Sequence, residues 1–263
     1  PWTGRRLAVD GGALHYLDEG PADAPVLLAV HGNPTWSLYW RALVRAFAGR
    51  YRVIVPDHLG CGLSDKPQGW PYRLDGHIGN LTRLVEALQL EDITLVVHDW
   101  GGAIGMGVAT RQPERFRRFV VTNTAAFLSR SIPLSIAAVK IPGFGPLSVR
   151  GLNAFARVAT WRAVSRRLSP EARLGLTWPY GSWAERIATL RFVQDIPLHA
   201  GHPSYATLAA IDAGLERLRD RPMLLCWGED DFCFTPRFRE QWMVRFPEAR
   251  VHAWSGVGHY VME

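Results

Sequence analysis

The sequence predicts an α/β protein with an open, mostly parallel sheet flanked by helices, and three observations support this. Short apolar segments alternate with segments of helical periodicity over most of the 263 residues. Several apolar segments are hydrophobic throughout, which is typical of parallel strands covered on both faces. The alternation lapses over residues 125–220, a stretch too long for a simple connection, so it must have structure of its own.

The expected strands are short apolar runs. They cover residues 5–9, 13–17, 26–30, 52–55, 93–97, 119–122, 223–227 and 250–254. The first two flank Asp10-Gly11-Gly12, which is typical of a hairpin turn. Apolar residues recur at helical spacing over 36–47 and 78–88. A further helix after residue 100 should end near Arg111, because Pro113 disfavours helical geometry in the residue before it.

We expect residues 1–124 and 221–263 to form the α/β core and residues 125–220 to form a helical cap inserted after the sixth strand. Because this segment lies between two strands of the sheet, it would cover their carboxyl ends, where open α/β sheets bind ligands. Seven prolines interrupt its helical pattern: Pro133, Pro142, Pro146, Pro170, Pro179, Pro197 and Pro203. Candidate apolar pocket residues are Ala126, Phe127, Leu128, Ile132, Leu134, Phe144 and Leu147.

The net charge of +6 arises from arginines that cluster between Arg130 and Arg173, interleaved with apolar residues. Charge alone is compatible with nucleic-acid binding, but no nucleic-acid motif is present, so we expect no nucleic-acid partner. A solvated basic face is the favoured interpretation, and peripheral contact with acidic lipid or with an acidic partner is the second. The apolar run over 132–149 is broken by Lys140 and by prolines and glycines, so it predicts no membrane span.

The three cysteines, Cys61, Cys226 and Cys233, are an odd number and form no C-x-x-C pair. The sequence therefore predicts neither a disulfide framework nor a zinc site, and it favours a reducing, cytoplasmic compartment. The first residues show no signal-peptide core and no initiator methionine. We expect either a processed amino terminus or a fragment.

The segment Val96-Val97-His98-Asp99-Trp100-Gly101-Gly102 joins an expected strand to an expected helix. This is the context of a nucleophile elbow, the sharp turn that raises one side chain above a sheet. The raised residue is usually a serine, which attacks acyl carbon, but here it is Asp99. An aspartate forms an ester with the atom it attacks, so the expected target is a saturated carbon that carries a leaving group.

Two later motifs provide partners for Asp99. Leu224-Leu225-Cys226-Trp227-Gly228-Glu229-Asp230-Asp231 is a strand that runs into an acidic loop, and Gly256-Val257-Gly258-His259-Tyr260 follows the last strand. The order nucleophile, acid, base is that of α/β-hydrolases. His259 would take a proton from water near neutral pH, and Asp231 would fix its tautomer and stabilise the imidazolium. Asp231 is the preferred acid and Asp230 the runner-up.

Further motifs complete the pattern: His31-Gly32-Asn33-Pro34 and Gly60-Cys61-Gly62-Leu63-Ser64-Asp65-Lys66-Pro67. With these, with Asp99-Trp100-Gly101-Gly102 and with the terminal histidine motif, the chain resembles the haloalkane dehalogenases over nearly its whole length outside the cap. The resemblance implies an α/β-hydrolase fold and no metal or organic cofactor. It also implies that the side-chain N–H groups of Asn33 and Trp100 bind the departing halide, while their backbone N–H groups hold the Asp99 carboxylate and later the ester oxyanion.

The chain departs from that family at two places. One branch takes its acid from the loop after the sixth strand, where this chain has Thr122-Asn123-Thr124, so the acid must be Asp231. Asn33 combined with that acid resembles the third dehalogenase subfamily, which is similar to the β-lactone decarboxylases of bacterial long-chain olefin synthesis. The chain also ends at Glu263, where the family continues into a final helix, so we expect a fragment or part of a fused protein.

Two reactions share this machinery. In the first, a haloalkane dehalogenase, Asp99 displaces halide from saturated carbon, and water activated by His259 hydrolyses the alkyl ester. In the alternative, a β-lactone decarboxylase, Asp99 displaces the ring carboxylate, and loss of carbon dioxide leaves an alkene. Either substrate is a small apolar molecule, and the second implies association with other olefin-pathway enzymes.

Two other functions rank lower. An epoxide hydrolase would need two cap tyrosines as acids, for which Tyr180 and Tyr205 are available, but Asn33 replaces its usual aromatic residue. A catalytically dead binding module, acting through the basic apolar cap, would need no intact Asp99, Asp231 and His259.

Overall fold

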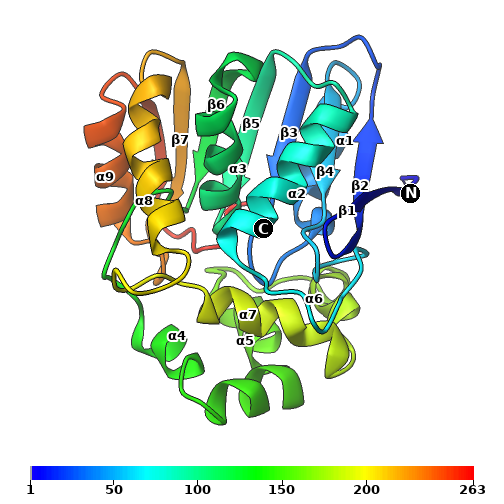
Figure 1. The fold of residues 1–263 in the computed structure, drawn as a ribbon, viewed down its shortest axis with the longest axis vertical. Helices are drawn as coiled ribbons and strands as arrows, with labels where there is room; N and C mark the ends of the chain where they lie inside the picture. The colour runs from blue at the N-terminus through cyan, green and yellow to red at the C-terminus, as the bar shows by residue number, and fades with distance from the viewer. Residues whose placement is uncertain (1) are drawn as a thin grey trace.

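The computed structural model describes residues 2–263, which contain an eight-stranded sheet with helices on both faces (Figure 1). The strands are β1 (Arg5–Val9), β2 (Gly12–Glu19), β3 (Val26–Val30), β4 (Arg52–Pro56), β5 (Ile93–His98), β6 (Phe116–Thr122), β7 (Met223–Gly228) and β8 (Arg250–Trp254). Their order is β1-β2-β4-β3-β5-β6-β7-β8, and β2 runs in the direction opposite to the other strands described. The mostly parallel sheet predicted from the sequence is confirmed.

Five helices lie along the sheet: α1 (Arg41–Phe47), α2 (Leu74–Ala87), α3 (Trp100–Arg111), α8 (Tyr205–Gly214) and α9 (Pro236–Arg245). Successive residues of the central strands point to opposite faces of the sheet and pack in two separate hydrophobic cores. Leu28 packs on the face that carries α2, α3, α8 and α9, whereas Leu27 packs on the face that carries α1. A short 3₁₀ helix, Ser37–Trp40, precedes α1. Helices therefore cover both faces of the central strands, as their apolar sequences require.

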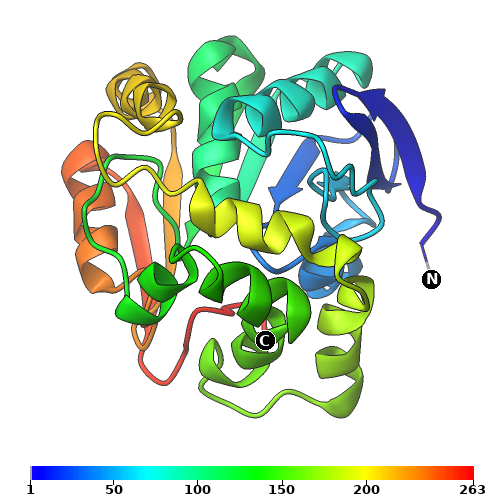
Figure 2. The same cartoon turned by 60° about the horizontal axis from the view of Figure 1, so that its bottom comes forward.

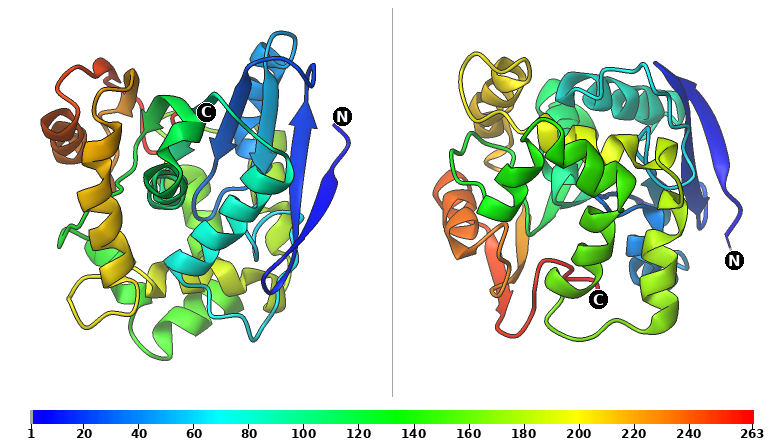
Figure 3. Two further views of the ribbon diagram at one scale, coloured as in Figure 1. Left: turned by 45° about the horizontal axis from the view of Figure 1, so that its top comes forward. Right: turned by 90° about the horizontal axis from the view of Figure 1, so that it is seen from below.

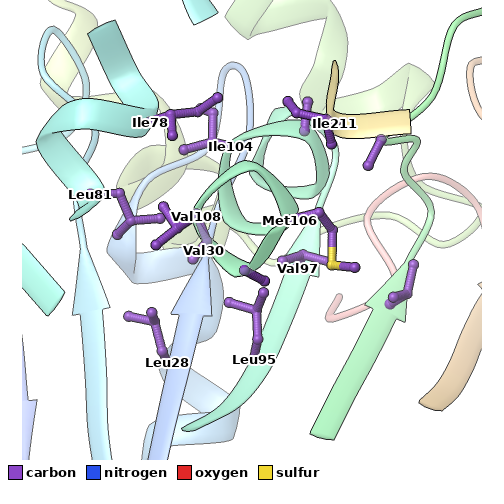
Figure 4. Close-up of a cluster of buried hydrophobic side chains, with 14 of the residues drawn as sticks. Leu28, Val30, Ile78, Leu81, Leu95, Val97, Ile104, Met106, Val108 and Ile211 are labelled. Atoms are coloured by element: carbon purple, nitrogen blue, oxygen red, sulfur yellow. The ribbon is translucent and has the colours of Figure 1, made fainter. Parts of the chain in front are cut away.

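The glycines of α3 allow this helix to approach both the sheet and α2 closely (Figure 4). A β-carbon at Gly105 would lie 2.8 Å from a methyl group of Val97, and one at Gly107 would lie 2.5 Å from a methyl group of Ile78. Helix–strand packing therefore explains these glycines. The helix ends at Arg111, as predicted.

Residues between β6 and β7 form two groups of helices. The first comprises α4 (Leu134–Val139), α5 (Ala154–Arg162), α6 (Pro170–Thr177) and α7 (Ile187–Gln194), and lies beyond the carboxyl ends of the strands (Figures 1 and 2). A π-helical turn, Pro146–Gly151, separates α4 from α5. By contrast, α8 packs beside α3 in the helical layer of the sheet.

Prolines delimit these helices as the sequence suggests. Pro133 lies directly before α4, and α6 begins at Pro170, where Ser169 Oγ accepts a hydrogen bond from the backbone N–H of Ala172 at 3.1 Å. No helix within residues 2–263 has the length and apolar character needed to cross a membrane.

Candidate active site

Asp99 occupies the sharp turn between β5 and α3, with a φ of 50° and a ψ of −127°. A non-glycine residue adopts this conformation only when its surroundings enforce it. The backbone N–H of Asp99 donates to the Asn123 carbonyl at 3.2 Å, and the Asp99 carbonyl accepts from Gly102 N–H at 2.9 Å and from the Thr124 hydroxyl. A β-carbon at Gly32 would lie 2.1 Å from Asp99 Oδ1, so glycine is required there.

The Asp99 carboxylate is buried but not isolated. Its Oδ1 accepts a hydrogen bond of 2.6 Å from the backbone N–H of Asn33. Burial raises the pKa of Asp99, while the nearby His259 and the backbone N–H groups of Asn33 and Trp100 act against that rise. The carboxylate is thus shielded from bulk solvent, and the backbone N–H of Asn33 fixes its orientation.

His259 follows β8 and lies between two carboxylates. Its Nδ1–H donates to Asp231 Oδ2 at 2.7 Å, and its Nε2 lies 3.8 Å from Asp99 Oδ2. Burial lowers the pKa of His259, but the charges of Asp231 and Asp99 outweigh burial and raise it above the ordinary value. Burial acts to raise the pKa of Asp231, but His259 and the hydrogen bonds to its carboxylate together lower it. The pair therefore favours an imidazolium–carboxylate state.

Asp231 follows β7 and is held in place by three donors. Besides His259, it accepts from Asn123 Nδ2 at 2.9 Å and from the backbone N–H of Cys233 at 2.7 Å. Asp230, the alternative acid, is instead near Ser165, whose hydroxyl lies 3.5 Å from Asp230 Oδ2. The structure therefore brings together Asp99, His259 and Asp231.

Asn123 holds Asp231 in place, a role that was not predicted from the sequence. It has a φ of 33° after β6, and its amide also bonds Gly228 in both directions, at 3.0 Å to the carbonyl and 2.8 Å from the N–H. It thereby ties the end of β6 to the loop that carries Asp231. Its position, where one dehalogenase branch has its acid, is the only sequence signal that pointed to it.

Asn33 and Trp100 contribute side chains to the wall beside Asp99. Asn33 Nδ2 donates to the carbonyl of Thr189 in α7 at 3.1 Å, while its buried Oδ1 has no hydrogen-bond partner within the described chain. The half-buried indole of Trp100 packs on Phe192, with ring centres 5.2 Å apart. The expected leaving-group donors therefore lie beside Asp99, and helix α7 contacts both side chains.

Two apolar cavities meet at Asp99, with about 880 Å³ and 1140 Å³ of atom-free space including their open mouths. Both are lined by Asn33, Asp99, Ile136, Phe155 and Cys233. The first continues between the sheet and cap along Trp100, Phe127, Ile132, Leu208, Phe234 and Phe238. The second continues under α5 along Val149, Val158, Ala159, Trp161, His259 and Tyr260.

The candidate pocket residues are only partly correct. Phe127, Ile132 and Phe144 line the cavities. Leu134 and Leu147 are instead exposed, because the short helix α4 and the turn after it direct them to solvent. The remaining two, Ala126 and Leu128, line neither cavity.

The tyrosines that an epoxide hydrolase would need are also elsewhere. Tyr180 is buried and donates to the Thr35 carbonyl at 3.3 Å, and Tyr205 lines a separate surface hollow. Within residues 2–263 no cluster of three His, Cys, Asp or Glu side chains is arranged to hold a metal ion.

The chain is similar to known proteins in both sequence and fold. A family model described as alpha/beta hydrolase fold matches residues 25–263. The cis-3-alkyl-4-alkyloxetan-2-one decarboxylase of Shewanella oneidensis is 45% identical, over 100% of this chain and 84% of the relative. Haloalkane dehalogenase 2 of Mycobacterium tuberculosis is 30% identical, over 95% and 89%. The crystal structure of a haloalkane dehalogenase from Bradyrhizobium elkani matches with a TM-score of 0.91 at 27% identity, covering 100% of this chain and 92% of that one.

Proposed function

Because the chain belongs to the α/β-hydrolase family, with oxetanone decarboxylases and haloalkane dehalogenases among its relatives, we propose that it decarboxylates a 3,4-dialkyl-oxetan-2-one, a β-lactone. The predicted resemblance to both kinds of enzyme is confirmed. The sequence alone placed dehalogenation first and lactone decarboxylation second. The higher identity to the decarboxylase reverses that order.

The two cavities that diverge from Asp99 carry this proposal. A dialkyl lactone has two chains on adjacent ring carbons, so a lactone whose carbon 4 lies at Asp99 needs two apolar channels that meet there. A simple haloalkane needs only one. Ile136 and Phe155 stand on the wall of both cavities and would separate the chains.

The first step would be a displacement at ring carbon 4. One oxygen of Asp99 attacks this carbon from the side opposite the ring oxygen, the carbon–oxygen bond breaks, and its electron pair leaves as a carboxylate on carbon 3. The Asp99 ester and a free carboxylate result. The side-chain N–H groups of Asn33 and Trp100 would stabilise the carboxylate as it forms, which is the charge that the transition state develops.

The second step would be a fragmentation. The bond from carbon 3 to the carboxylate breaks and its electrons form the double bond. The ester bond at carbon 4 breaks at the same time and returns its electron pair to Asp99. Carbon dioxide leaves, and no proton or water is consumed. Since a carboxylate becomes a neutral gas, apolar walls favour this step.

In this reaction His259 and Asp231 would act through charge. The imidazolium that Asp231 supports lies beside Asp99 and opposes the effect of burial on that carboxylate. This charge favours the ionised form of Asp99, the form that attacks carbon, and His259 takes part in no bond change.

Haloalkane dehalogenation is the second candidate, and the position of His259 favours it. Its Nε2 lies 3.8 Å from Asp99 Oδ2, so a water molecule bound to it could attack the carbonyl of an Asp99 ester. The same Asn33 and Trp100 side chains would then bind halide.

The test is a paired assay of the purified protein on a cis-dialkyl β-lactone and on 1-bromobutane, with Asp99→Asn as the control. We expect alkene formation that the Asp99→Asn variant loses by roughly 10⁴-fold or more. Bromide release without alkene would establish the second candidate. Folded protein with neither activity would overturn both and leave the binding module.

Three further assignments belong to this proposal. We take the cap to be α4–α7, with α8 part of the core, because α8 packs on α3. A cytoplasmic location rests on the three free cysteines, Cys61, Cys226 and Cys233.

Association with other olefin-pathway enzymes would supply the lactone. Co-purification of the protein with those enzymes would test this association.

A further inference from the structure

The net positive charge of the chain comes from the cap. Residues 125–200 contain ten Lys and Arg but only three Asp and Glu, whereas the whole chain contains 30 and 24. The remainder, with 20 basic and 21 acidic residues, is therefore close to neutral. The helices that cover the active-site end of the sheet therefore carry an excess of positive charge, which attracts anionic surfaces.

Exposed apolar side chains gather in the same part of the chain. Of the fourteen large hydrophobic residues exposed within residues 2–263, ten lie between Leu134 and Trp183. Among them are Trp161, Leu174 and Trp178, with exposed fractions of 66%, 67% and 63%. Large apolar side chains that are exposed near one another often mark an interaction surface.

The two features meet in a surface groove between α5 and α6, which lie side by side (Figure 3, right). Trp161 and Leu174 line it together with Arg166, Arg167 and Arg173. The lining includes no carboxylate, and across the described chain none of these arginines forms an ion pair. Unpaired guanidinium groups beside exposed aromatic and aliphatic side chains match the polar boundary of an anionic lipid layer.

The groove also leads to the active site. Trp161 lines both the groove and the second cavity, which reaches Asp99 and His259. Phe144 and Val158, both exposed, stand on the wall of the same cavity. Exposed apolar side chains of the cap therefore stand both at the basic groove and on the wall of the cavity that reaches Asp99.

We propose that the α5–α6 face of the cap docks on an anionic lipid bilayer, and that the second cavity takes up its apolar substrate from that bilayer. The proposal of docking depends only on the unpaired arginines and exposed apolar side chains of this face, whereas the proposal of substrate uptake rests on the proposed function. A bilayer fits better than an acidic protein, because it offers a broad anionic layer directly above an apolar interior.

The test is flotation of the full chain with vesicles of phosphatidylcholine containing 30% phosphatidylglycerol, compared with phosphatidylcholine alone. We expect binding only to the anionic vesicles, weakened by 500 mM salt. The triple variant Arg166→Gln, Arg167→Gln, Arg173→Gln should bind on the order of a hundred-fold more weakly. The matched control Arg50→Gln, Arg83→Gln, Arg118→Gln removes the same charge from exposed, unpaired positions outside the cap and should bind as the wild type does.

Absence of flotation by the wild type, or equal losses in the two triple variants, would overturn the docking. Docking would also be overturned by a concentration-dependent dimer that is seen in sedimentation and that only the cap variant fails to form, because the face would then bind a second copy.

Flotation needs no catalytic turnover, so its result does not depend on the result of the lactone assay. If docking holds, uptake requires that the cap variant have a lower kcat/KM than the wild type for lactone in anionic vesicles and the same kcat/KM in detergent. A cap variant that equals the wild type in vesicles as well as in detergent would overturn uptake.

Discussion

Asp99 Oδ2 and His259 Nε2 lie 3.8 Å apart, beyond hydrogen-bond length and within the range of an ion pair. No proton is therefore shared between them in the free enzyme. Both side chains are buried, so the attraction between imidazolium and carboxylate is little screened by solvent. This separation suits a histidine that acts by charge in one reaction and through a bound water in another.

Replacement of His259 separates the two reactions. Decarboxylation consumes no water, so His259→Gln should keep alkene formation within about ten-fold of wild type, whereas ester hydrolysis should fall by roughly 10²–10⁴-fold. After incubation with 1-bromobutane, intact-protein mass spectrometry should show a butyl group retained on the chain.

The control for that experiment is Asp99→Asn combined with His259→Gln, which should retain no butyl group. If His259→Gln abolishes alkene formation as completely as Asp99→Asn does, the fragmentation needs a proton transfer and the mechanism proposed above is wrong.

Asp99→Asn should stabilise the folded protein near neutral pH. Burial raises the folded-state pKa of Asp99 above 3.8, so the folded state binds its proton more tightly than the unfolded chain does. Ionised Asp99 therefore costs stability above its folded pKa, and this cost disappears as the pH falls below 3.8. Thermal unfolding at pH 7.5 should show a gain of about 1 kcal/mol. The gain should shrink toward acid pH, and a pH-independent gain would contradict this cause.

The elements that the sequence predicted share one property, namely that a local pattern determines them. The apolar run of β5 followed by Asp99 and two glycines specifies an elbow within a few residues, and α3 ended at Arg111. Strand ends of a parallel sheet meet at one edge, which is why Asp231 and His259 could be placed near Asp99 from their strands alone.

What the sequence did not reveal depends on contacts between distant segments. The bond from Asn33 to Thr189 joins residues 156 positions apart and depends on how α7 lies over the sheet. The division of the pocket into two cavities arises in the same way, from Ile136 and Phe155 of the cap facing Asp99. No periodicity encodes such packing, and for this reason Leu134 was wrongly assigned to the pocket.

The adjacent acids Asp230 and Asp231 should differ sharply when each is changed to asparagine. Asp231→Asn leaves the donors of Asn123 and His259 without a full acceptor, at a cost of about 1–3 kcal/mol in unfolding free energy. It should also lower the pKa of His259, because Asp231 is the main group that raises it. Asp230→Asn should change neither. NMR titration of the His259 imidazole measures its pKa in each variant. Equal changes of this pKa in both variants would contradict the assignment of Asp231 as the acid.

The leaving-group donors are tested by Asn33→Ala and Trp100→Phe. Removal of either donor should lower kcat by roughly 10²–10³-fold with less effect on KM, since the charge it stabilises forms only in the transition state. Trp100→Phe keeps an aromatic ring against Phe192 and so isolates the indole N–H. A rise in KM with an unchanged kcat would show that these side chains bind substrate rather than the developing carboxylate.

The two cavities should select the two alkyl chains independently. Ile132→Trp narrows the first cavity and Ala159→Trp the second, and neither residue lines both. Against lactones in which one chain is long and the other is methyl, each variant should lose kcat/KM by about ten-fold or more for one series and spare the other, because a filled apolar channel excludes several methylenes. The matched controls Ile132→Val and Ala159→Gly widen the same channels and should preserve both series. If both tryptophan variants impair the same series, a single channel holds both chains. The divergence at Asp99 would then not explain the substrate, and dehalogenation would become the better assignment.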